Sequence, residues 1–271
     1  MFTTIITDCY EGNEAGRQIT RFNSLGLGPT SLIGVKSDFS VDSAIEGGAN
    51  LVDMLDASQG KSGVVVLNVA PRGNKLEGEN GNPFCYFYYK KTLVISTIKG
   101  HCLSFVKHFG ITNKVNLLEL KDALDFARDK NLINGGLEKY ITNTQFRSFD
   151  FVPRLAKWLI DDISIPSRHY SLSTIHLPPT CIWCIDAFGN AKLSITSNDI
   201  PLKEAPCKFK TNLGTFLYYE RLKDLPFGKT AIYIGSSGIG DNRFLEFATQ
   251  GISGSIARKL NLKVGDKIEI K

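Results

Sequence analysis

The run from Gly63 to Ala70, GVVVLNVA, constrains the fold more than any other stretch of the sequence. A β-branched run bounded by glycine and proline is typical of a strand that is buried on both faces. Thr3 to Thr7 and Thr30 to Val35 predict two further strands. Apolar residues at helical spacing predict a helix from Val41 to Ala57, between the second and third of these strands. Strands that alternate with helices indicate an α/β domain with a mostly parallel central sheet.

The same alternation continues to about residue 165. Cys85 to Tyr89 and Thr92 to Thr97 predict a hairpin, and Leu120 to Lys130 and Val152 to Ile160 predict helices. Proline, serine and threonine then become frequent, which is typical of a linker. We therefore expect the α/β domain over residues 1–165 and a linker over residues 166–180.

Beyond the linker, short strands are separated by glycine-rich turns. The expected strands are Ile182 to Ile185, Ala191 to Ile195, Gly214 to Tyr219, Ala231 to Ile234 and Lys267 to Ile270. One short helix fits, from Ser253 to Leu260. This pattern predicts a smaller all-β, barrel-like domain over residues 181–271.

Composition and charge exclude several classes of protein. The chain has 42% hydrophobic and 22% charged residues, as in ordinary globular proteins, and its net charge of +5 is spread along the sequence. We therefore expect no nucleic-acid partner. No apolar run reaches the roughly 18 residues that cross a bilayer, and Asp8 comes too early for a signal peptide. A cytoplasmic protein without membrane contact is expected. Cys181 and Cys184 form a lone CxxC without further ligands, which favours buried strand cysteines over a metal site.

Three polar segments of the C-terminal part could carry chemistry. Asp186 to Asn190 is a glycine-containing turn with a carboxylate and an amide, which either face one ligand or form a plain Asx turn. Tyr233 to Gly238 places two serines between glycines, an arrangement suited to a carboxylate or phosphate. Phe244 to Gly251 is a strand whose aromatic residues either stack on a purine or pack in the core.

In this order, and with Leu262-Lys263-Val264-Gly265-Asp266 near the end, the three segments resemble one known family. It is the family of S-adenosylmethionine (SAM) hydroxide adenosyltransferases and SAM-dependent chlorinases and fluorinases. The likeness covers residues 182 to 270 and is interrupted by an insertion from Ile239 to Arg243. Ile6-Thr7-Asp8, after the first strand, is similar to the Thr/Ser-Asp of that family.

The resemblance implies a set of ligand-binding residues. Asp186 with Ser236 or Ser237 would hold the amino and carboxylate ends of methionine, and Asp8 the ribose hydroxyls. Asn190 and the backbone from Thr249 to Gly251 would read the adenine, with Phe244 as a packing partner. Asp8 could equally be a turn or N-cap residue. The resemblance also implies a homotrimer with sites between subunits, no metal and no separate cofactor, since SAM itself is the substrate or ligand.

The water-activating residues of the family are altered in this sequence. Asn68 occupies the position of the Asp in the family's Asp-Pro-Gly-Val-Gly-x-x-Arg motif, and Lys75 the position of its Arg. Arg147 matches the Arg of Phe-His-Gly-Arg-Asp, but the His is absent. An amide cannot take a proton at neutral pH, and lysine lacks the planar fork of arginine.

Three functions remain open on the sequence. The first is a SAM hydrolase that forms adenosine and L-methionine by displacement at the ribose C5′, with Asn68, Lys75 and Arg147 as the catalytic set. The second is a SAM- or adenosine-binding protein with weak or no catalysis. A SAM-dependent halide transferase is the least favoured, since nothing in the sequence marks a halide pocket.

Overall fold

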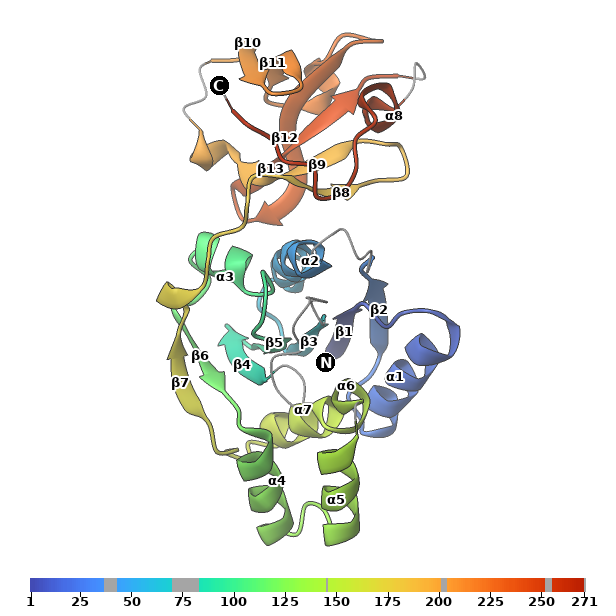
Figure 1. Ribbon diagram of the computed structural model, residues 1–271, viewed down its shortest axis with the longest axis vertical. Helices are drawn as coiled ribbons and strands as arrows, with labels where there is room; N and C mark the ends of the chain where they lie inside the picture. The colour runs from blue at the N-terminus through green and yellow to red at the C-terminus, as the bar shows by residue number, and fades with distance from the viewer. Residues whose placement is uncertain (37–42, 70–82, 145, 201–203, 252–254, 271) are drawn as a thin grey trace. The chain divides into compact units, whose positions relative to one another are not determined.

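A computed structural model describes residues 1–36, 43–69, 83–144, 146–200, 204–251 and 255–270. The chain divides into two units, Met1–Leu177 and Pro178–Lys271 (Figure 1). The stretch expected as a linker, residues 166–180, differs from this division. It contains strand β7 (Arg168–Ser171), which pairs with β6 (Lys114–Leu117) inside the first unit.

The first unit contains a seven-stranded sheet in the order β2-β1-β3-β5-β4-β6-β7. Its other strands are β1 (Phe2–Thr7), β2 (Thr30–Gly34), β3 (Gly63–Asn68), β4 (Phe84–Tyr89) and β5 (Thr92–Thr97). The first four strands in the sheet run parallel, and each of the last three is antiparallel to its neighbour. Only β4 and β7 therefore oppose the rest, which confirms the expected mostly parallel sheet.

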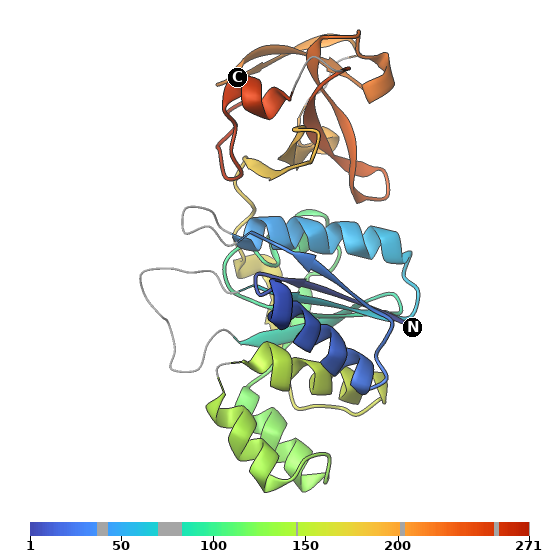
Figure 2. The ribbon, with the colours of Figure 1, turned by 90° about the vertical axis from the view of Figure 1, so that its right-hand side faces the viewer.

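Helices cover both faces of this sheet. They are α1 (Gly12–Ser24), α2 (Ser43–Ser58), α3 (Ser104–His108), α4 (Leu120–Asp129), α5 (Gly135–Asn143), α6 (Arg147–Asp150) and α7 (Val152–Ile160). Helices α2 and α3 lie on one face, and α1 and α7 on the other (Figures 1 and 2). The helices predicted near α2, α4 and α7 are confirmed, whereas α1, α3, α5 and α6 were not predicted. No described helix is long and apolar enough to cross a bilayer.

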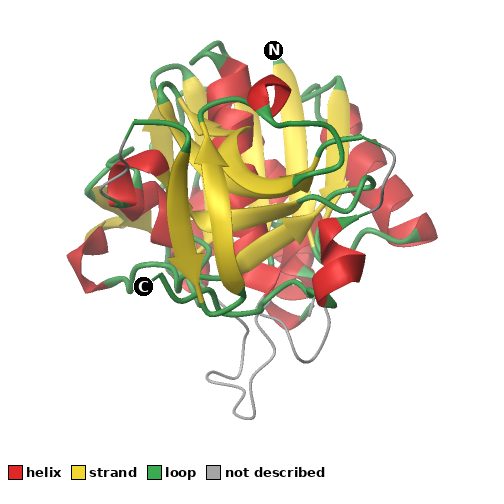
Figure 3. Cartoon of the chain, turned by 90° about the horizontal axis from the view of Figure 1, so that it is seen from above, coloured by secondary structure: helices red, strands yellow, loops and turns green. Residues whose placement is uncertain are grey.

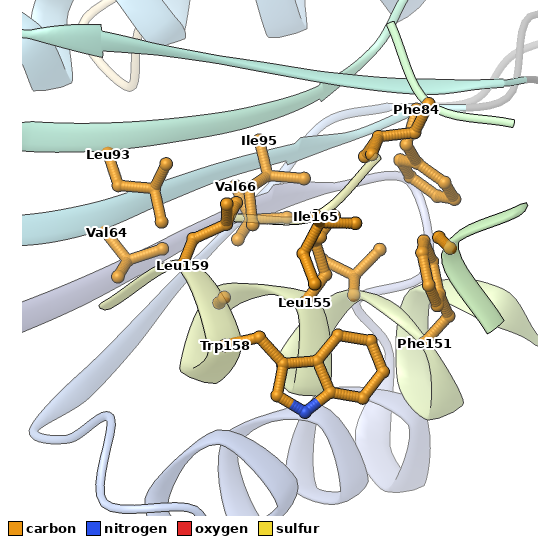
Figure 4. Packing of buried hydrophobic residues seen from close by; sticks show 14 of the residues in the cluster. Val64, Val66, Phe84, Leu93, Ile95, Phe151, Leu155, Trp158, Leu159 and Ile165 are labelled. Atoms are coloured by element: carbon orange, nitrogen blue, oxygen red, sulfur yellow. The ribbon is translucent and has the colours of Figure 1, made fainter. Parts of the chain in front are cut away.

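Apolar side chains of α7 join this helix to the sheet. Figure 4 shows Leu155 and Leu159 directed toward strand residues such as Val64 and Ile95, whereas Trp158 lies on the side of α7 away from the strands. Every one of these side chains is at most 6% exposed. Each contributes roughly 1.5–3 kcal/mol when buried, so this contact fixes the position of α7 and of the short helix α6 before it.

The second unit contains a six-stranded sheet in the order β10-β11-β12-β13-β9-β8. Figure 3 draws the strands of the chain in yellow. Its elements are β8 (Ile182–Ile185), β9 (Ala191–Thr196), β10 (Cys207–Thr211), β11 (Gly214–Tyr219), β12 (Thr230–Ile239), β13 (Asn242–Thr249) and α8 (Ile256–Leu260). All pairings are antiparallel except β11 with β12.

One strand predicted for this unit is wrong. Lys267 to Ile270 forms only two isolated bridges, from Lys267 to Cys181 and from Ile270 to Thr211. Ile268, between them, is 2% exposed and joins the hydrophobic core of the unit. The alternating apolar pattern at the end of the chain therefore reports burial of one side chain rather than a continuous ladder of hydrogen bonds.

Candidate functional site

Asp8 and Asn68 lie at the same edge of the first sheet, where the parallel strands β1 and β3 end. Thr7 and Asn68 face each other in the pairing of these strands, and the Asn68 Nδ2 donates to Thr7 Oγ1 at 3.4 Å. Asp8, the next residue after β1, is partly buried, and the thiol of Cys9 lies 3.7 Å from its Oδ1. The carboxyl edge of parallel strands is where α/β folds bind ligands.

The other two residues of the expected catalytic set are Lys75 and Arg147. Lys75 lies outside the described residues. Arg147 begins α6, and its Nε is buried without a hydrogen-bond partner in the described part of the chain. Burial lowers the pKa of its guanidinium. Within the described ranges, no hydrogen bond or ion pair connects Arg147 to Asp8 or Asn68.

In the second unit, the carboxylate of Asp186 closes the turn between β8 and β9. Its Oδ1 accepts from the backbone N–H groups of Phe188 and Asn190, both at 2.9 Å, and Oδ2 accepts from Asn190 Nδ2 at 3.0 Å. This is the Asx-turn alternative considered from the sequence. The side chains of Asp186 and Asn190 are therefore hydrogen-bond partners of each other.

The turn packs against the start of α8 and lies next to the end of β13. Ser255 Oγ and the Ala257 N–H both donate to the carbonyl oxygen of Gly189. Ala191 pairs with Phe247 on β13, which brings the preceding Asn190 toward Thr249. The structure thus places these expected adenine-reading residues at one end of the sheet.

Gly189 requires a glycine for two reasons. Its φ is +78°, and an added Cβ would lie 1.8 Å from Ser255 Oγ. We expect Gly189→Ala to lower the free energy of unfolding by about 2 kcal/mol, measured by urea denaturation. Gly16→Ala is the matched control, because Gly16 is helical and its Cβ position is open. That change should stabilise the chain by roughly 0.5–1 kcal/mol. Equal effects of the two substitutions would contradict the described packing.

The remaining predicted residues of this unit differ in exposure. Phe244 is 0% exposed and lies 5.5 Å from the Trp183 ring, centroid to centroid. It is a core residue, and the expectation that it packs on the ligand is corrected accordingly. The Thr249 hydroxyl lies 2.8 Å from that of Thr230. At Gly251, φ is +89° and an added Cβ would meet the ring of the exposed Phe227.

Ser236 and Ser237 occupy an irregularity in β12 and have different surroundings. Ser236 is exposed, and its carbonyl oxygen accepts from Arg243 Nη1 at 3.1 Å. Ser237 is buried, and its hydroxyl accepts a hydrogen bond from Lys192 Nζ. Lys192 follows Asn190 by two residues and so links the serine segment to the Asp186–Asn190 turn.

Lys192 belongs to a buried polar cluster that sequence reasoning did not identify. Its Nζ lies 3.9 Å from Glu246 Oε1 and 5.2 Å from the centre of the Trp183 ring. The Tyr233 hydroxyl donates to Glu246 Oε2. Burial is the largest cause that raises the pKa of Tyr233, and the hydrogen bond to Glu246 is the second. The negative charge of Asp186 adds to this increase, so the cluster and the turn share one electrostatic environment.

Within the described residues, no group of three or more His, Cys, Asp and Glu side chains could hold a metal ion.

The similarity of this chain to known proteins is limited to its fold. No protein-family model and no curated protein matches the chain.

Two solved structures share its architecture. An uncharacterized conserved protein from Thermotoga maritima matches with a TM-score of 0.66 at 15% identity over 100% of both chains. A conserved hypothetical protein from Thermus thermophilus matches with a TM-score of 0.56 at 13% identity, over 100% of this chain and 99% of the other. At these identities the likeness establishes the fold alone: a mixed α/β chain with one mostly parallel and one mostly antiparallel sheet.

Proposed function

We propose that this protein binds SAM and hydrolyses it to adenosine and L-methionine. The observation that carries the proposal is the partly buried Asp8, which directly follows the paired residues Thr7 and Asn68 at the carboxyl edge of parallel strands. The second unit of the same chain contains three segments whose sequences, and whose order along the chain, resemble those of a SAM-cleaving family. Under this proposal the assembly is a homotrimer, and each site combines the first unit of one subunit with the second unit of its neighbour.

The proposed reaction is a displacement at the ribose C5′. The oxygen of water forms a bond to C5′ while the bond from C5′ to the sulfonium sulfur breaks. The electron pair of that bond returns to sulfur, which gives neutral methionine, and the water proton passes to solvent. The sulfonium is already a good leaving group, so the protein has to orient and desolvate the water. Asn68, Lys75 and Arg147 are the proposed orienting residues, and Asp8 would accept hydrogen bonds from the ribose.

SAM or adenosine binding without turnover is the second candidate. One observation favours it: the Asn68 amide donates to Thr7 and, as an amide, cannot accept a proton from water. Calorimetric titration with SAM, adenosine and methionine, followed by chromatography of the same samples, separates the two candidates. Hydrolysis requires adenosine that accumulates beyond one equivalent per chain. Saturable binding without product would support binding without turnover and exclude hydrolysis. Absence of binding would refute both candidates.

The role of Asp8 provides a prediction for either candidate. Asp8→Asn should weaken SAM binding about tenfold, because hydrogen bonds to a charged acceptor exceed those to a neutral one by roughly 1 kcal/mol or more. Calorimetry measures the change. Asp122→Asn on α4, an exposed site with the same loss of charge, should leave the affinity unchanged. Equal affinities of the Asp8→Asn variant and the original chain would remove Asp8 from the site.

A further inference from the structure

A hollow on the surface of the first unit gathers arginine side chains around one aromatic ring. It is lined by one face of α1, including Gly16, Arg17, Thr20 and Arg21, and by Phe149 of α6. The guanidinium carbons of Arg17 and Arg21 lie 4.5 and 4.3 Å from the centre of the Phe149 ring. A cation over an aromatic face is attracted by the ring, so Phe149 holds both guanidinium groups at the hollow.

Positive charge at this place exceeds negative charge. Arg17 and Arg21 are one helical turn apart, a spacing at which like charges repel. A third guanidinium, that of Arg154, has its pKa lowered by burial and by the charge of Arg21. The acidic partner here is Asp150, whose Oδ1 lies 3.8 Å from Arg21 Nη1.

Asp150 neutralises only part of this charge. Its side chain is 3% exposed, so it is withdrawn from the surface of the hollow. Its Oδ2 accepts from Thr144 at 3.4 Å. Arg17 makes no ion pair with any described residue and is exposed to solvent. Of these three guanidinium groups, only that of Arg21 forms an ion pair with a carboxylate among the described residues.

The hollow has room for a chemical group of a ligand next to these charges. The Cβ position of Gly16 meets no atom within 4 Å. Thr20 and Ser24 are small residues that line the hollow from α1, and Thr20 is exposed. Small polar residues beside two ring-held guanidinium groups form an open, preorganised set of donors.

We propose that this hollow binds a phosphate group of a small anionic molecule. A phosphate has two charges and three or more acceptor oxygens, which match two planar guanidinium forks, whereas a single carboxylate would leave one fork without a partner. Binding would also relieve the repulsion between Arg17 and Arg21. None of the lining residues belongs to the proposed SAM site, so this proposal does not rest on that function.

Titration calorimetry with inorganic pyrophosphate tests the proposal. The full chain should bind one pyrophosphate saturably, and the affinity should fall as salt is raised. Arg17→Gln should weaken binding about tenfold, the usual loss when one charge-assisted hydrogen bond is removed. Arg17 is the residue of choice because Arg21 also pairs with the buried Asp150, so its loss could perturb folding. Gly16→Glu places a carboxylate in the hollow and should weaken binding at least as much.

Two controls make the result specific. Arg258→Gln on α8 removes the same charge from an exposed helical site in the other unit and should leave the affinity unchanged. Gly135→Glu adds the same carboxylate as Gly16→Glu at an open position of α5 outside the lining of the hollow, and should preserve binding. Absence of saturable binding would overturn the proposal, as would equal weakening by Arg17→Gln and Arg258→Gln. Circular dichroism melting of each variant establishes that a loss of binding is not a loss of fold.

Discussion

The Asn68→Asp variant is expected to release adenosine from SAM about a hundredfold faster than the original chain. A positioned general base typically contributes about 10²–10⁴-fold, and aspartate supplies at this strand end the proton acceptor that the amide lacks. The backbone need not change, because Asp and Asn have the same shape. Thr7 Oγ1 lies 3.4 Å from the Asn68 amide and could donate to the new carboxylate. Chromatographic measurement of adenosine under steady turnover gives the ratio of rates.

The pH profile of the same variant distinguishes a base from a nonspecific charge. If the carboxylate of residue 68 removes the proton from water, the rate should rise with pH through the pKa of that carboxyl and then level off. Asn113→Asp, an exposed position before β6, is the matched control and should not change the rate. A variant that binds SAM as before but shows no acceleration would contradict the proposed position of the water. If the original chain does not bind SAM, the proposed function itself is refuted.

The central strands could be predicted because burial on both faces leaves a strong pattern. Val64, Val65 and Val66 are each at most 1% exposed, and their β-branched run requires no knowledge of distant contacts. Asp8 and Asn68 could then be placed near each other, since each lies at the end of one of two such strands. Their joint position at the carboxyl edge is a consequence of parallel pairing alone.

Elements with little apolar surface of their own could not be predicted in the same way. Helix α1 buries only Gln18 and Phe22, and no side chain caps its N-terminus. Its helical form therefore depends on packing in the folded unit rather than on a local signal. Strand β7 has an almost wholly exposed sequence, and it becomes a strand because β6 offers an unpaired edge. When only the neighbouring sequence is considered, the prolines near β7 indicate a linker.

Side chains that act across strands were also invisible from the sequence. Lys192 is an ordinary alternating residue of β9, and its contacts with Ser237 and Glu246 depend on the register of three strands. The sequence leaves Phe244 open between core and ligand, because aromatic residues serve both cores and purine sites. The fold decides between these roles by placing Trp183 against its ring.

The Lys192–Glu246 pair, in which Glu246 is buried and Lys192 partly buried, is where the second unit should respond most strongly to mutation. Glu246→Leu is expected to lower the free energy of unfolding by about 3 kcal/mol. It leaves the ammonium of Lys192 without this carboxylate and the buried hydroxyl of Tyr233 without its acceptor. The side chain of Glu246 is 5% exposed and that of Lys192 20%, so water can compensate only in part. Urea denaturation followed by circular dichroism measures the loss.

The double variant Lys192→Met/Glu246→Leu identifies the cause of that loss. If the uncompensated charge dominates, removing Lys192 as well should restore more than about 1 kcal/mol relative to Glu246→Leu alone, a clear departure from additivity. Lys210→Met, an exposed lysine on β10, is the control and should change stability by less than about 0.5 kcal/mol. Additive single effects would show that each side chain stabilises the unit by packing rather than by its charge.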